Sequence, residues 1–271
     1  MALTSRMDWL YSTPSWQLAI TLFVILLGGM FGGFLLGKDA ARRGEQEAGA
    51  ADSAVKGAVA GLAALLLAFS FSLAANRYDQ RNTLVLREAN SIRDTWLRAD
   101  LLEEPTRGRI QQLLRDYLDA RLKYIGAGFN PTQIGAAAMA AQQLQQQIWQ
   151  VISEQSRINP QPRNVSTMVP AVNEMIDAGA AIEAAYSNTV PAIVLILLFA
   201  AIVFTGLLVG HSFGRAGRRH VLTAVVFALL VTLVVSVILD LDRPRRGVIR
   251  ENFGPLENLR TTVRPALSTA Q

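Results

Sequence analysis

Residues 190–210 read VPAIVLILLFAAIVFTGLLVG, and residues 221–239 read VLTAVVFALLVTLVVSVIL. Neither stretch contains Asp, Glu, Lys or Arg, and the same holds for residues 16–37 and 57–75. The four stretches have 19 to 22 residues, and a helix needs about 20 apolar residues to cross the core of a bilayer. The sequence therefore predicts an all-α, multi-pass membrane protein with four transmembrane helices.

The four predicted spans form two hairpins. The first hairpin occupies residues 16–75 and the second occupies residues 190–239, with a polar stretch at 76–189 between them. An N-terminal segment at 1–15 and a juxtamembrane segment with the C-terminal tail at 240–271 complete the division. Four crossings place both termini and the polar stretch on one side of the membrane. Basic residues flank the spans on both sides, so the positive-inside rule leaves the orientation open.

The polar stretch predicts an extramembrane bundle of helices. No Pro or Gly interrupts residues 76–104, so the second span continues as a helix into the bundle, a rod of about 70 Å at 1.5 Å per residue. Three more helices are expected at 107–125, 131–157 and 164–188, each with apolar residues at helical spacing. Short connections between amphipathic helices are typical of a bundle. The tail after residue 247 is expected to be loosely ordered.

Composition argues against catalysis and against nucleic-acid binding. The chain has no cysteine and only two histidines, His211 and His220, which flank a basic loop without a carboxylate at metal-ligand spacing. Motifs of nucleophilic or phosphate-binding enzymes are missing from the sequence. The net charge of +5 is expected to anchor the spans to the lipid bilayer. We therefore expect no enzyme activity, no cofactor, no metal and no nucleic-acid partner.

Glycines are concentrated in the first two spans. The first span carries G-x-x-x-G steps, as does the second, and such steps let helices approach closely in lipid. The candidate helix-packing residues are Gly28, Gly29, Gly32, Gly33, Gly57 and Gly61. The favoured interpretation is packing within the first hairpin, and the alternative is contact between subunits.

Charged residues gather where the second and fourth spans end. The candidate juxtamembrane charge network consists of Arg77, Asp79, Arg81, Glu88, Asp240, Asp242 and Arg243. Asp240 directly follows an apolar run, where an unpaired charge is costly. We therefore expect Asp240 or Asp242 to pair with Arg77 or Arg81. The network is either a girdle of ion pairs or the charged vestibule of a pore.

These residues carry a resemblance to a known family. Ala-Asn-Arg-Tyr-Asp at 75–79, Arg-Glu-Ala-Asn at 87–90, Asn-Glu-Met-Ile-Asp at 173–177 and the Asp-Leu-Asp-Arg-Pro element at 240–244 resemble the bacterial bestrophin-like membrane family. The resemblance implies four spans with a helical insert in a bacterial inner membrane, and kinship with homo-oligomeric anion channels. The chain lacks an obvious acidic cluster for calcium, so calcium gating is not implied.

Two functions remain open at the level of sequence. The first is a bestrophin-like, homo-oligomeric ion channel for small anions, with the second span as pore liner. The candidate pore-lining residues, which share one face of that helix, are Leu62, Leu65, Phe69, Ser72 and Asn76. The alternative is a non-conducting sensor or scaffold whose bundle binds a ligand or partner protein.

Overall fold

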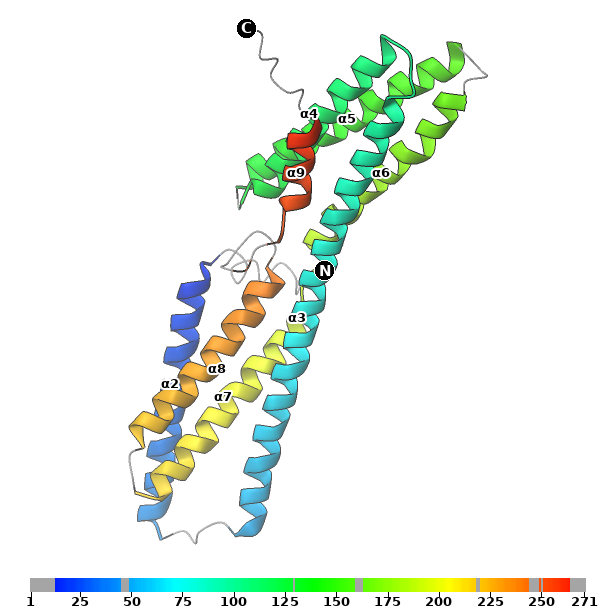
Figure 1. Ribbon diagram of the computed structural model, residues 1–271. Coiled ribbons are helices and arrows are strands. Elements are labelled where there is room, and N and C mark those ends of the chain that lie inside the picture. The colour runs from blue at the N-terminus through cyan, green and yellow to red at the C-terminus, as the bar shows by residue number, and fades with distance from the viewer. Residues whose placement is uncertain are drawn as a thin grey trace. The chain divides into compact units, whose positions relative to one another are not determined.

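The computed structural model describes residues 13–44, 49–128, 130–158, 163–217, 220–243, 249 and 251–263. Within these ranges all regular secondary structure is helical, which confirms the predicted fold class. The helices (Figure 1) are α2 (Ser15–Arg42), α3 (Ala50–Ala99), α4 (Thr106–Gly126), α5 (Pro131–Ile158), α6 (Arg163–Ser187), α7 (Ala192–Arg215), α8 (Val221–Asp242) and α9 (Gly254–Val263).

The chain divides into two compact units. Residues 1–77 and 189–249 form the first, here called the membrane unit, and residues 78–188 and 250–271 form the second, here called the helical unit. The boundary falls within α3, which is one uninterrupted helix of 50 residues, as the sequence predicts. The predicted N-terminal segment at 1–15 and the predicted C-terminal segment at 240–271 are described only in part, because residues 1–12, 244–248, 250 and 264–271 lie outside the described residues.

In the described part of the chain, four helices are long and apolar enough to cross a bilayer, and their predicted spans lie within the membrane unit. Four candidate spans are found, at Ser15–Arg42, Asp52–Ala99, Ser166–Arg215 and Val221–Asp242, and each contains most or all of one predicted span. In this unit α2, α7 and α8 lie side by side (Figure 1). α2 buries a stripe of Leu18, Leu22, Leu26 and Met30, which recur every four residues and so share one helix face.

Glycines let α2 and α7 pack with their backbones in contact. A Cβ atom on Gly33 would overlap the backbone of Leu207, and a Cβ atom on Gly210 would overlap the carbonyl oxygen of Met30. Gly37 of α2 and Gly214 of α7 are equally enclosed by the facing backbone. The prediction that the glycines of the first span pack within the first hairpin is therefore wrong for Gly33, which packs against α7 of the second hairpin.

The other candidate packing glycines are less constrained. Gly29 lies 3.9 Å from the Val203 carbonyl oxygen, measured from an ideal Cβ position. Gly28, Gly32, Gly57 and Gly61 have no described atom within 4 Å of that position. The close contact instead uses Gly206, Gly210 and Gly214, a G-x-x-x-G-x-x-x-G run on α7 that complements the α2 glycines because small residues at both surfaces allow close approach.

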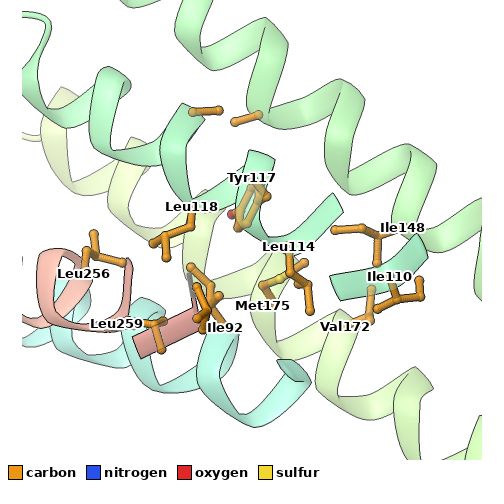
Figure 2. Close-up of a cluster of buried hydrophobic side chains, with 14 of the residues drawn as sticks. Ile92, Ile110, Leu114, Tyr117, Leu118, Ile148, Val172, Met175, Leu256 and Leu259 are labelled. Carbon is orange, nitrogen blue, oxygen red and sulfur yellow. The ribbon is translucent and has the colours of Figure 1, made fainter. Parts of the chain in front are cut away.

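The helical unit has an apolar core built by the second half of α3 and by α4, α5, α6 and α9. Figure 2 shows side chains from these helices converging, with Leu114 and Tyr117 of α4 next to Met175 of α6. Ile92, Ile110, Leu114, Leu118, Ile148 and Met175 are each at most 1% exposed. Burial of such side chains contributes about 1.5–3 kcal/mol each, so this unit has a sizeable core of its own.

The C-terminal segment belongs to this core, contrary to the expected loose tail. Residues 254–263 form α9, and its Leu256, Leu259 and Val263 are buried in the core (Figure 2 labels Leu256 and Leu259). The three residues are spaced by three and four positions, which places them on one face of a helix. This spacing favours a helix despite Pro255, because Pro255 lies in the first turn, where proline is tolerated.

Candidate functional site

The five candidate pore-lining residues form one exposed face of α3, here called the Leu62–Asn76 face. Leu62, Leu65 and Phe69 are 53%, 66% and 54% exposed, and Ser72 and Asn76 are exposed as well. Within one chain these side chains are therefore not packed against the other helices of the membrane unit. Whatever covers the Leu62–Asn76 face lies outside the single chain.

α3 carries a second exposed face on which small residues predominate, and Phe71 continues this face toward Arg77. Its members, here called the small-residue face, are Gly57, Ala60, Gly61, Ala64 and Ala68, and all five are exposed. A third face, with Ala63, Ser70 and Ala74, is buried. At 3.6 residues per turn the three faces point in directions roughly a third of a turn apart. The membrane half of α3 therefore has one face that packs against its own chain and two different faces that no other described part of the chain covers.

Polar groups occupy the end of the Leu62–Asn76 face that is nearer Arg77. Among the described residues none hydrogen-bonds the side chain of Ser72 or Asn76. Arg77 follows directly, is half-buried, and has an Nη1 atom that is buried without a hydrogen-bond partner in the described part of the chain. Exposure of polar groups without hydrogen-bond partners to hydrocarbon costs free energy. Hydroxyl, amide and guanidinium donors are instead suited to binding an anion.

The end of α8 is tied to two other parts of the membrane unit. Asp240 accepts a hydrogen bond from Ser15 Oγ at 2.8 Å, at the start of α2. Asp242 accepts a hydrogen bond from the Val190 backbone N–H at 2.8 Å, just before α7, and is fully buried. Arg243 Nη1 donates to the Thr13 carbonyl oxygen at 3.2 Å. The Asp-Leu-Asp-Arg element thus joins the ends of α2, α7 and α8.

The other members of the predicted charge network lie on α3. Arg81 Nε donates to Glu251 Oε1 at 2.8 Å, and both side chains are buried. This pair fixes the segment before α9 to α3 in the helical unit, and the Asn252 N–H adds a hydrogen bond to Asn82 Oδ1 at 3.0 Å. Asp79 is exposed. Pairing of Asp240 or Asp242 with Arg81 stays a prediction, and Arg77 has no ion-pair partner among the described residues.

Glu88 lies elsewhere, in a buried polar cluster of the helical unit. Arg121 of α4 donates from Nε to Glu88 Oε1 and from Nη2 to Glu88 Oε2 at 3.3 Å. Tyr117 OH donates to Glu88 Oε1 at 3.2 Å, and Arg121 Nη1 donates to Glu183 at 2.9 Å. Breaking one partner of such a buried pair costs about 3–5 kcal/mol because a charge is left uncompensated.

Sequence reasoning missed Tyr117, Arg121 and Gly179 as members of this cluster. Burial and the nearby Glu88 carboxylate raise the pKa of the Tyr117 hydroxyl above its ordinary value, so it stays protonated and can donate. A Cβ atom on Gly179 would lie 2.8 Å from Tyr117 OH, so a glycine is needed where α6 passes the cluster. The described residues contain no group of three or more acidic or histidine side chains that could hold a metal ion.

The geometry defines a class of protein: an α-helical membrane protein whose longest helix links a four-span unit to an extramembrane helical unit. The model of the bestrophin-like domain family matches residues 24–250. The chain therefore belongs to the bestrophin-like family, which confirms the resemblance read from its motifs. No curated protein matches the sequence.

Solved structures share this fold. A bacterial bestrophin homologue from Klebsiella pneumoniae carrying a leucine-to-threonine substitution matches with a TM-score of 0.68 and 14% identity, over 90% of this chain and 96% of that chain. A variant of that homologue with an isoleucine-to-threonine substitution matches with a TM-score of 0.67 and 16% identity, over 90% of this chain and 97% of the other. At such identities the likeness concerns the fold alone.

Proposed function

We propose that this chain is a subunit of a homo-oligomeric anion channel in a bacterial inner membrane, in which the Leu62–Asn76 face of α3 lines the pathway. The observation that carries the proposal is the division of α3 into three faces. In a ring of identical subunits a pore-lining helix has three neighbours: its own chain, the adjacent subunit and the pore. α3 has one buried face and two exposed faces of different character, which suits that arrangement.

The two exposed faces differ in the way the proposal requires. The small-residue face suits close packing against a helix of the adjacent subunit. The Leu62–Asn76 face combines large apolar side chains with Ser72 and Asn76. Rings of apolar side chains gate pores by excluding water, and the hydroxyl and amide offer donors to an anion. The membership of the bestrophin-like family supports the same function.

Arg77 is expected to favour anions at the mouth of the pathway. Its guanidinium follows Asn76 directly and lacks an ion-pair partner among the described residues. A positive charge at a narrow mouth attracts anions and repels cations. We expect Arg77→Gln to lower the chloride-to-sodium permeability ratio by about threefold or more, measured from reversal potentials of purified protein in planar bilayers under a salt gradient.

The matched control is Arg109→Gln. Arg109 is exposed on α4, so its loss removes the same charge from the chain and should leave the permeability ratio unchanged. If Arg109→Gln and Arg77→Gln shift the ratio equally, Arg77 has no local role. If the wild-type protein and the Phe69→Ala variant discussed below both fail to conduct, the channel is excluded in favour of a non-conducting sensor or scaffold.

A further inference from the structure

The helical unit has a polar groove lined by residues of α5 and α6. The groove has a volume of about 470 Å³, within the range of sites for small molecules. Its walls come from four glutamines of α5, from Trp149, and from Asn173 and Ile176 of α6. All of the described residues that line it are uncharged.

The lining residues indicate the chemistry of a ligand. Each glutamine and asparagine amide offers both donors and acceptors, which is what a molecule with several hydroxyl groups requires. Trp149 is 39% exposed, so part of its indole is open to a ligand. Aromatic rings provide a flat apolar surface for the C–H face of a sugar, and the indole N–H adds a donor. A charged ligand would find no opposite charge on these walls.

One wall of the groove is fixed in place by the buried cluster beneath it. Gln145 Nε2 donates to Tyr117 OH at 3.0 Å, and Tyr117 OH in turn donates to Glu88. The amide nitrogen of Gln145 is therefore held by the protein, and its orientation does not have to be selected when a ligand binds. Preorganised groups of this kind lower the entropic cost of binding. A row of freely solvated glutamines would not lower that cost.

We propose that this groove binds a small, uncharged, polyhydroxylated molecule of the class of mono- or disaccharides, with Trp149 stacking on it and Gln145, Gln146 and Asn173 hydrogen-bonding its hydroxyls. The proposal does not depend on conduction. The proposed ligand binds the helical unit and, because it is uncharged, does not alter the net charge of the protein. The proposal also places that ligand on Gln145, which two hydrogen bonds through Tyr117 connect to Glu88 on α3.

Calorimetric titration of the purified full-length chain tests the proposal. The probes are glucose, sucrose and gluconate, the last carrying hydroxyls like those of glucose together with a negative charge. We expect saturable binding of glucose or sucrose with a dissociation constant on the order of 1 mM, and binding of gluconate at least about tenfold weaker because its carboxylate gains no partner in the groove.

Variants locate the binding. Trp149→Ala and Gln146→Ala should each weaken sugar binding by about fivefold or more, while Gln147→Ala, exposed on α5 outside the lining, should leave it unchanged. Gln146 is exposed, so its variant tests the groove without disturbing the core. Absence of saturable binding of either sugar, equal binding of gluconate, or binding that survives both Trp149→Ala and Gln146→Ala would overturn the proposal.

Discussion

Phe69→Ala is expected to raise the anion conductance of reconstituted protein by about tenfold, which corresponds to ~1.4 kcal/mol removed from the barrier. Phe69 is 54% exposed and lies with Leu62 and Leu65 on the Leu62–Asn76 face. In a ring of subunits these side chains form an apolar constriction that excludes water, and truncation of the largest one widens and wets it. Single-channel recording in planar bilayers measures the change.

The control is the other exposed phenylalanine of this part of α3. Phe71 is 44% exposed but lies two positions away, so it points away from the Leu62–Asn76 face and lies on the side of the small-residue face. Phe71→Ala removes the same volume and should leave the conductance unchanged. An equal effect of both variants, or a larger effect of Phe71→Ala, would contradict the assignment of the pore-lining face.

Gly33→Ala is expected to destabilise the membrane unit by about 3 kcal/mol or more, or to abolish the folded protein. The added methyl group would overlap the backbone of Leu207 and lie 2.9 Å from the His211 nitrogen. Backbone atoms cannot move aside as a flexible side chain can, so α2 and α7 would have to separate. Thermal unfolding in detergent, followed by the loss of monodisperse protein, measures the effect.

The neighbouring glycine provides the control. Gly32 is also in α2, but a Cβ atom there would have no described atom within 4 Å. Gly32→Ala should therefore leave the unfolding temperature unchanged or raise it, since alanine favours a helix over glycine by up to about 1 kcal/mol. Equal unfolding temperatures for Gly32→Ala and Gly33→Ala would show that the backbone contact is not what stabilises the unit.

The four spans and the bundle were predictable because both depend on local periodicity. Runs without charge define the spans, and apolar spacing defines the helices of the bundle. The partner of α2 was not predictable in the same way. Gly33 marks α2 as a close-packing helix, but every other span is a possible partner, and only the matching Gly206, Gly210 and Gly214 run on α7 points to the right one.

The buried cluster around Glu88 shows a second limit. Glu88 lies on the stripe that also carries Val85 and Ile92, and Arg121 lies on the stripe of Leu114 and Leu118. A charge on an apolar stripe signals a buried ion pair, and both residues carried that signal. It did not reveal which charge meets which, because that depends on the register between α3 and α4. The pattern of α9 was obscured by Pro255, although Leu256, Leu259 and Val263 have helical spacing.

The most direct test of the pathway is modification of a single cysteine at position 72 by a negatively charged thiol reagent during recording. The chain contains no cysteine, and Ser72→Cys is nearly isosteric, so the reagent reports one position. The account predicts that the reagent strongly reduces anion current through Ser72→Cys channels and leaves unchanged the current through Gln147→Cys channels, which are modified at an exposed position of α5 in the helical unit. Unaltered current in Ser72→Cys channels that mass spectrometry shows to be modified would contradict the assignment of the Leu62–Asn76 face as the lining of an anion pathway.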